Sequence, residues 1–367
     1  MKIGIITLPP SFNYGNILQA WALQTILERM GHQAEIVVGV PRRFKLSAWS
    51  KPLVYAKRAF QKYIGGEKNI VVRNEEIMDV LLKNTECFIQ SYLHLREFKS
   101  FADIKETDYN AFVVGSDQIW RKRYNADIRN CYLKFAKDWN VRRVAYAASF
   151  GTANWEYSDE ETKECSDLLS LFDGISVRER SGVALVKNKL QQEALHVLDP
   201  TLLLDKEDYE SLFLSNKEVP QSKGDLLCYV LSKDESVSSE ISRIAREKAL
   251  VPFRVNSRFD EPTAPLEERI QPPVESWLRG FYDAKLVATD SFHATVFSII
   301  FKKPFIIFGS GIRGNERMES LLTMAGFNLD NGFIGRLFEP SDSNVECIRK
   351  YREKSLEFLK TSVCKRM

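Results

Sequence analysis

Short apolar runs alternate with amphipathic stretches along most of the chain. In the first half, runs bounded by polar or turn residues predict buried strands at 2–8, 34–38, 111–114, 143–149, 174–177 and 196–198. Stretches with apolar residues at helical spacing lie between several of these runs, and the clearest covers 17–30 and stops at Gly31. This order of strand, helix and strand is typical of α/β domains with parallel sheets.

A second alternation follows a polar connection at 205–225. It predicts strands at 226–231, 252–255, 285–289 and 304–308, with helices at 236–249, 274–282, 291–301 and 317–325 between and after them. A chain of 367 residues also exceeds the usual size of one hydrophobic core. We therefore expect two Rossmann-like domains facing across a cleft: residues 1–204 with a helical insertion at about 41–108, and residues 205–343. A C-terminal helix at 344–367 can pack back on the first domain.

Composition argues against several classes of protein, namely those that bind nucleic acid, hold a metal, depend on disulfides or cross a membrane. The net charge is only +3, and no basic run with interleaved aromatic residues covers the chain, which argues against nucleic acid as a partner. The six cysteines occur singly, without a C-x-x-C pair or a Cys/His cluster, so we expect no metal and no disulfide framework. No apolar run reaches the ~20 residues that cross a bilayer, and the first strand begins directly after Met1. These features predict a soluble cytoplasmic protein.

His293 is the sharpest candidate for chemistry. It stands two residues into a helix that begins directly after the predicted strand 285–289, with Asp290 or Ser291 as the cap. The unpaired N–H groups of a helix N-terminus favour a phosphate or a carboxylate. His293 is therefore predicted to be a proton donor or a phosphate ligand, and the alternative is a histidine packed near the cap for structural reasons.

Polar residues also follow other predicted strands, where an open α/β sheet binds its ligand. Arg178 and Arg180 end the strand 174–177, and one of them can clamp a carboxylate or phosphate unless both form surface ion pairs. Ser116 and Asp117 end the strand 111–114. Asp117 can take a proton from a sugar hydroxyl or can cap the next helix.

Two glycine-containing turns complete the candidate site. The turn after the first strand lacks the G-x-G-x-x-G pattern of dinucleotide-binding proteins. It offers polar groups to a sugar or an anion: Asn13, Tyr14, Asn16 and Gln19. The turn at 309–315 carries Arg313, with Arg317 just beyond it, and forms either a lid or an ordinary surface turn.

Seven segments in this order resemble the polysaccharide pyruvyl transferase family and together extend over residues 2–325. They read NYGNxLQA from residue 13, GSDQIW from 115, YAASFG from 146, SVRE from 176, DPT from 199, TDSFHAT from 289 and KPF from 303. The resemblance implies two facing Rossmann-like domains of the glycosyltransferase-B kind. It also implies transfer of a pyruvyl group from phosphoenolpyruvate to two hydroxyls of a sugar, with formation of a ketal, release of phosphate and no cofactor.

The resemblance also assigns roles to residues. The family's histidine falls on His293 and an arginine of the family falls on Arg178, so His293 is expected to act in catalysis with Asp117. Some members carry arginine two residues before this histidine, where this chain has Ser291. Donor binding is therefore expected from Ser291 and the arginines: Arg178, Arg180, Arg313 and Arg317. Acceptor binding falls to the polar groups near the first two turns: Asn13, Tyr14, Asn16, Gln19 and Ser116.

The acceptor expected for such a protein is a sugar of a cell-surface or exopolysaccharide precursor, free or carried by a lipid. A lipid-linked acceptor would bring the protein to the inner face of the membrane. The basic stretch 42–58, with Trp49 and Tyr55 among its charges, can assist there. Two alternative functions remain: a glycosyltransferase that uses a nucleotide sugar on the same architecture, and a glycan-binding protein without catalysis.

Overall fold

The computed structural model describes residues 1–39, 51–309 and 315–364. Its first sheet has seven strands in the order β3-β2-β1-β4-β5-β6-β7, and every neighbouring pair is parallel. The strands are β1 (Lys2–Ile6), β2 (Gln33–Gly39), β3 (Leu95–Phe98), β4 (Ala111–Val114), β5 (Arg142–Ala148), β6 (Gly174–Val177) and β7 (Leu195–His196). The reversal of strand order beside β1 is the Rossmann arrangement, which places ligands at the carboxyl ends of the strands near that point.

Alternating side chains of this sheet enter two hydrophobic layers. Ala111 and Val113 of β4 belong to the layer that α1 (Tyr14–Arg29) and α3 (Met78–Tyr92) cover. Phe112 and Val114 belong to the opposite layer, under α4 (Asp159–Leu169) and α5 (Arg180–Leu190). Because both faces are buried, the strands read as continuous apolar runs, and this made them recognisable in the sequence.

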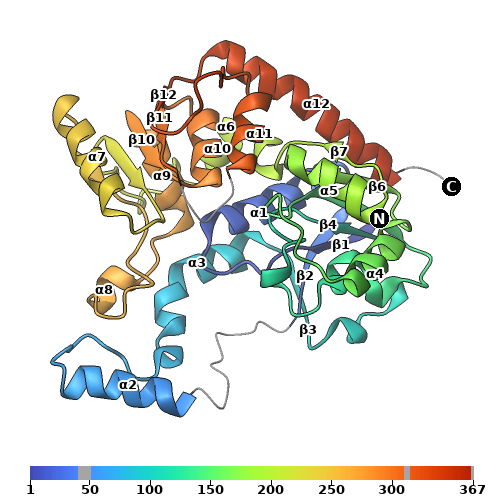
Figure 1. Cartoon of the computed structure of the whole chain (residues 1–367), viewed down its shortest axis with the longest axis horizontal. Helices are drawn as coiled ribbons and strands as arrows, with labels where there is room; N and C mark the ends of the chain where they lie inside the picture. Colours follow the sequence, from blue (N-terminus) through green and yellow to red (C-terminus); the bar gives the residue numbers. More distant parts are fainter. Residues whose placement is uncertain (40–50, 310–314, 365–367) are drawn as a thin grey trace.

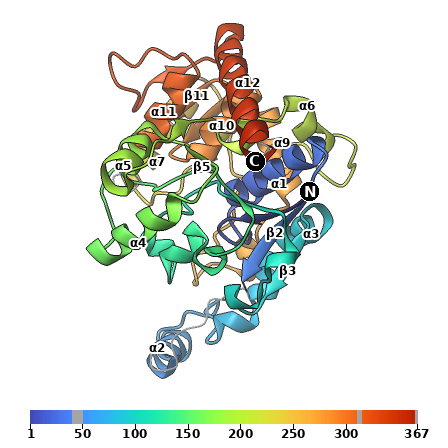
Figure 2. The same cartoon turned by 90° about the vertical axis from the view of Figure 1, so that its right-hand side faces the viewer.

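Short 3₁₀ helices occupy many of the connections in the first part of the chain. They are η1 (Asn74–Glu76), η2 (Phe101–Asp103), η3 (Glu106–Asp108), η4 (Lys122–Tyr124), η5 (Ile128–Tyr132), η6 (Lys134–Ala136) and η7 (Pro200–Leu202). The helix α2 (Lys51–Tyr63) projects from the rest of the molecule, as Figures 1 and 2 both show.

The second sheet has five strands in the order β12-β11-β10-β8-β9. The strands are β8 (Leu226–Tyr229), β9 (Pro252–Phe253), β10 (Leu286–Thr289), β11 (Phe305–Ile307) and β12 (Leu337–Phe338), and only β12 is antiparallel to its neighbour among the described pairs. The helices of this part are α6 (Lys206–Ser211), α7 (Glu235–Glu247), α8 (Leu266–Arg269), α9 (Val274–Asp283), α10 (Phe292–Ile300) and α11 (Glu316–Met324).

The last helix, α12 (Asp342–Cys364), connects the two sheets. It follows the second sheet in the chain but packs against β5 of the first, and Figure 1 shows it ending beside β6. Ser355 accepts a hydrogen bond from Leu198 N at 3.1 Å, and Arg352 Nε donates to Leu202 O at 2.7 Å. These bonds hold the second sheet close to the carboxyl ends of the first.

The prediction of two α/β units facing one another is confirmed by these sheets and by the pocket between them. The range 41–108, predicted as a helical insertion, also supplies the strand β3. This edge strand escaped detection because its four residues, Leu95 to Phe98, are polar in the middle and none is buried.

Candidate active site

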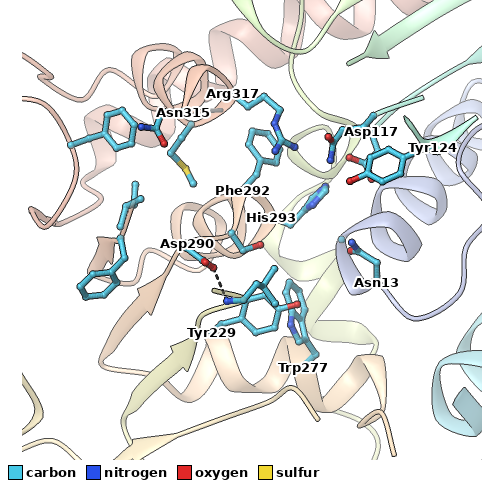
Figure 3. Close-up of a pocket in the computed structure, with 18 residues that line it drawn as sticks. Asn13, Asp117, Tyr124, Tyr229, Trp277, Asp290, Phe292, His293, Asn315 and Arg317 are labelled. Atoms are coloured by element: carbon cyan, nitrogen blue, oxygen red, sulfur yellow. Dashed lines mark hydrogen bonds between the residues drawn. The ribbon is translucent and has the colours of Figure 1, made fainter. Parts of the chain in front are cut away.

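A pocket lies where the carboxyl ends of the two sheets meet, with a cavity volume of about 150 Å³. Its walls come from the segments that follow β1, β4, β8, β10 and β11. Figure 3 shows His293 extending from α10 toward Asp117 and Asn13, whereas the ring of Phe292 lies beside Arg317, which reaches in from α11. Of the residues predicted for the site, the structure brings five to this pocket: Asn13, Asp117, Ser291, His293 and Arg317.

His293 lies against the first turn of α1, in the other half of the molecule. An ideal β-carbon on Gly15 would lie 2.1 Å from His293 Nδ1 and 2.3 Å from Cγ. Only glycine at position 15 leaves room for the imidazole in this position, since a real β-carbon never approaches another heavy atom so closely. The glycine of the NYGN turn therefore admits the histidine to the pocket.

The other ring nitrogen of His293 has no hydrogen-bond partner. Nε2 lies 3.8 Å from Asp199 Oδ2, which is an ion-pair distance but too long for a hydrogen bond. The side chain is only 10% exposed, and it opens on the pocket. A buried ring nitrogen without a partner can transfer a proton to a ligand or accept one from it.

The N-terminus of α10 also opens on the pocket. Ser291 is the capping residue, but its side chain accepts no bond from the helix, and its own N–H donates to Thr289 Oγ1 at 3.0 Å. Asp290, the other predicted cap, instead accepts from Leu231 N and Ser232 N at 2.8 Å each. The first N–H groups of α10 thus keep their positive end for a ligand.

Arg178 forms the centre of a buried charge network. Its side chain is fully buried, and it donates from Nη1 to Asp199 Oδ2 at 2.6 Å and from Nη2 to Asp117 Oδ1 at 3.0 Å. Burial alone would lower the pKa of Arg178, but Asp199 and Asp117 raise it above its usual value. Phe292 covers the guanidinium, with its ring centroid 4.4 Å from Cζ.

Asp199 stays ionised within this network. Burial would raise the pKa of its carboxyl, but His293 and Arg178 lower it well below the usual range. Thr201 adds two hydrogen bonds to Oδ1, from its N–H at 3.0 Å and from its hydroxyl at 2.6 Å. Arg178 was predicted to bind the donor. In the structure both acids occupy its guanidinium, so that Arg178 positions Asp117 at the pocket wall instead.

Among the residues that the structure describes, Arg317 is the cation that faces the pocket. Its side chain is about nine-tenths buried, Nε has no partner, and no carboxylate lies within ion-pair distance among the described residues. Burial and the neighbouring charge of Arg178 lower the pKa of Arg317, and the more distant charges of Asp117 and Glu179 oppose this only in part. A buried guanidinium without a counter-ion is costly, and an anionic ligand would relieve this cost.

Four residues predicted to bind the acceptor lie beneath the pocket instead. The hydroxyl of Tyr14 donates to Pro272 O at 2.9 Å, and its ring stacks on Trp277, so this side chain joins the two halves of the molecule. Gln19 is fully buried, donates to Thr7 Oγ1 and accepts from Ser116 N. Asn16 donates to Leu8 O and Pro9 O, and Ser116 Oγ donates to Ala147 O. Their polar atoms support the turns that carry Asn13 and Asp117.

Arg180 is absent from the described wall of the pocket, although it was predicted to bind the donor. Arg180 is exposed at the start of α5, and its backbone N–H donates to Ser320 Oγ at 3.0 Å. Arg313 lies outside the described residues.

Sequence reasoning missed several residues of the pocket wall. Gln118 and Tyr124 follow β4, whereas Tyr229 and Trp277 come from the second half. Gln118 could have been found from its place directly after Asp117. Tyr124 and Trp277 carried no such signal, because neither stands directly at the end of a strand. Among the described residues, no three His, Cys, Asp or Glu side chains gather at a distance suited to a metal ion.

Fold and site together define a two-domain α/β protein with a cation-lined pocket between its sheets. Residues 13–311 match the polysaccharide pyruvyl transferase family, and the chain belongs to this family. It is therefore a member of an enzyme family whose transferases modify polysaccharides, with a sugar or polysaccharide as acceptor.

Solved structures also show likeness over nearly the whole chain. UDP-GlcNAc 2-epimerase from Neisseria meningitidis is 9% identical, with a TM-score of 0.49 and coverage of 99% of this chain and 93% of that chain. A glycosyltransferase from Rickettsia africae is 11% identical, with a TM-score of 0.49 and coverage of 100% and 99%. At these TM-scores the likenesses support no inference about fold or activity. No curated protein matches the chain in sequence.

Proposed function

We propose that the protein transfers a pyruvyl group from phosphoenolpyruvate to two hydroxyls of a sugar in a cell-surface or exopolysaccharide precursor. The observation that carries this proposal is the pair formed by Arg317 and His293 in one pocket, each nine-tenths buried and each with an unpartnered nitrogen. Phosphoenolpyruvate needs such a pair, because it brings two anionic groups and a carbon that must receive a proton.

The donor would bind between α10 and α11. Its carboxylate or phosphate would accept hydrogen bonds from Arg317, and its other anionic group would lie at the open N-terminus of α10 with the Ser291 hydroxyl beside it. Ser291 is neutral where some relatives carry arginine, so Arg317 supplies the fixed positive charge of this wall. No cofactor is required for the reaction that follows.

In this reaction the methylene carbon of the donor gains a proton and the adjacent carbon bonds to two sugar oxygens. The bond from that carbon to the phosphate oxygen breaks, and phosphate leaves. The two hydroxyls lose two protons: one balances the proton gained by the methylene group, and the other leaves with phosphate or solvent. His293 would donate the proton to carbon, and Asp117 would accept a proton from the attacking hydroxyl.

Asp117 is suited to this task by its surroundings. Arg178 holds one of its oxygens at 3.0 Å, and the carboxylate lines the same pocket as His293. Asn13 lies across from it on the exposed side, where the acceptor sugar would enter. Arg178 and Asp199 act as positioning residues in this scheme, since neither touches the substrate.

Phosphate release from phosphoenolpyruvate in the presence of candidate glycans tests the proposal. We expect His293→Ala to lower the rate at least ~100-fold, as loss of a general acid does. His94→Ala is the matched control, because His94 is exposed and pairs with Glu28 on the surface. A loss below threefold in His293→Ala would remove this residue from the mechanism. Turnover of a nucleotide sugar, or sugar binding without turnover, would replace the proposal with one of its rivals.

We also propose that the protein works in the cytoplasm at an anionic membrane surface, through α2. Among the described residues, no helix combines the length and the apolar character that crossing a bilayer requires. None of the α2 side chains is buried, and its apolar face points outward: Leu53 is 76% exposed, Phe60 60% and Tyr63 76%. Between Glu35 and Glu67 the chain has seven Lys and Arg residues and no acidic residue. An apolar helix face with flanking basic residues is typical of peripheral membrane helices.

Sedimentation with vesicles of phosphatidylglycerol and phosphatidylcholine tests this surface. Each lysine near an anionic membrane contributes about 1 kcal/mol, so the triple change Lys51→Gln, Lys57→Gln and Lys62→Gln should weaken binding roughly 100-fold. Replacing three surface lysines elsewhere, such as those of α12, is the control. Binding that the α2 changes leave intact would exclude this surface.

A further inference from the structure

A second cavity, of about 430 Å³, lies between α2, α3 and the loop that carries α8. Phe12 and Phe259 form one wall, with ring centroids 5.4 Å apart and planes at 10°. Arg269, the last residue of α8, lines the cavity together with Arg58 of α2 and Asn74 of η1. The cavity therefore combines an aromatic wall with two guanidinium groups.

Arg269 is almost completely buried and has no counter-ion. Arg269 is only 1% exposed. Among the described residues, its guanidinium donates one hydrogen bond, from Nη2 to Asn74 Oδ1 at 3.2 Å. Nε and Nη1 have no partner, and no carboxylate approaches the guanidinium within ion-pair distance in the described parts of the chain. Burial and the charge of Arg58 both lower the pKa of Arg269. Arg269 thus has a charge and two donor nitrogens without an acceptor, whereas on Arg317 in the first pocket Nε is the buried nitrogen that lacks one among the described residues.

The acidic residues of the cavity do not meet this need. Glu75 accepts a hydrogen bond from the hydroxyl of Tyr55, and Asp260 is exposed at the mouth. Arg58 donates from Nη1 to Val72 O at 3.3 Å, and its charge helps to lower the pKa of Glu75, but it forms no ion pair within 4 Å among the described residues. The two cations therefore favour an external anion with several oxygens, and phosphate matches the fork of an arginine.

The position of the cavity indicates which molecule would bring this anion. Phe12 lines it, and the next residue, Asn13, lines the pocket that holds His293. A sugar whose hydroxyls reach His293 can pass Asn13 and continue along the face of Phe12. Gln271 fixes this boundary, because its side chain bonds to Phe12 O at 3.4 Å and accepts from Ser257 Oγ at 3.0 Å.

We propose that the cavity around Arg269 binds the phosphate or diphosphate through which the acceptor sugar is attached to its carrier. This inference rests on the proposed function for the identity of the sugar, but the anion site itself does not depend on it. The acceptor class is then a glycosyl phosphate or diphosphate rather than a neutral finished polysaccharide. Arg58, which comes from α2, places the carrier end of such a molecule beside the outward apolar face of that helix.

Isothermal titration calorimetry with inorganic pyrophosphate tests the site on the full chain. We expect Arg269→Gln to weaken binding roughly tenfold or more, because it removes a charge-assisted pair of hydrogen bonds. Arg58→Gln should weaken binding as well, and it guards against a folding defect in the first variant. Arg254→Gln is the matched control, since Arg254 is exposed on the same segment. Affinity for pyrophosphate that neither Arg269→Gln nor Arg58→Gln changes would overturn the proposal.

Two further titrations separate this proposal from the proposed function. Phosphoenolpyruvate should bind Arg269→Gln as it binds the wild type, whereas Arg317→Gln should lose phosphoenolpyruvate and keep pyrophosphate. If phosphoenolpyruvate fails to bind the wild type, the proposed function fails while the pyrophosphate result still decides the anion site. A soluble sugar 1-diphosphate that binds more tightly than inorganic pyrophosphate supports an acceptor phosphate, and one that competes no better than free phosphate contradicts it.

Discussion

The imidazole of His293 occupies the space that a side chain on Gly15 would fill, with 2.1 Å between Nδ1 and the site of a β-carbon. Gly15 belongs to α1, which follows β1 of the first sheet. His293 belongs to α10, which follows β10, the central strand of the second sheet. The contact therefore sets the distance between the two halves at the point where the reaction is proposed to occur.

Gly15→Ala should displace His293 from the pocket. An added methyl group without space usually costs about 1–3 kcal/mol, and here the group that yields is the proposed acid, so transfer should fall with stability. The unfolding midpoint and the transfer rate of the variant measure both effects.

Gly39→Ala is the control for this change, because a β-carbon on Gly39 would meet nothing within 4 Å. The double change Gly15→Ala with His293→Ala should recover most of the lost stability but none of the activity. Full activity in Gly15→Ala would show that the imidazole does not need this position.

Removing the charge of Arg178 and removing the charge of Arg317 should have different effects on the stability of the protein. Arg178→Met leaves Asp117 and Asp199 buried without their partner, and breaking such a network typically costs about 3–5 kcal/mol. Arg317→Met removes a buried charge that forms no ion pair within 4 Å among the described residues and feels Asp117 and Glu179 only at longer range, so the stability of the free protein should stay equal or rise. Thermal unfolding of both variants gives the comparison, and a large loss of stability in Arg317→Met would mean that this guanidinium has a structural partner.

The stabilising effect of Asp199 on the folded protein should change with pH only in the acid range. Its pKa in the folded protein lies below the ordinary value of 3.8, so its stabilising effect is complete above that value and is lost as the pH falls toward the folded pKa. The difference in unfolding free energy between wild type and Asp199→Asn should be constant from pH 7 to pH 5 and shrink below about pH 4. A difference that shrinks already between pH 7 and pH 5 would show that the carboxyl is not held ionised.

Much of this arrangement could be predicted from the sequence. The parts that could not be predicted have a physical reason in common. The strands were recognisable because both faces of each sheet are buried, and His293 was recognisable because it follows a strand at the start of a helix. The pairing of Arg178 with Asp117 and Asp199 joins residues 61 and 21 positions apart, and no local pattern reports it. Arg317 stands out only in three dimensions, because the sequence does not say which arginine lacks a partner.

Tyr14 illustrates the same limit and leads to a further prediction. Its place in the NYGN turn pointed to acceptor binding, but its hydroxyl is used against Pro272 and Gln271 of the second half. Tyr14→Phe should therefore lower the stability by about 1 kcal/mol, the usual worth of a buried hydrogen bond, and leave the KM for the acceptor unchanged. A raised KM with unchanged stability would return Tyr14 to the acceptor site.

The binding of phosphoenolpyruvate to the free protein tests the central claim most directly, because it needs no knowledge of the acceptor. Calorimetric titration of the wild type should show saturable binding of phosphoenolpyruvate, and Arg317→Gln should weaken it roughly tenfold or more. Nucleotide sugars should give no binding in the same titration. Tight binding of a nucleotide sugar, with none of phosphoenolpyruvate, would contradict the account.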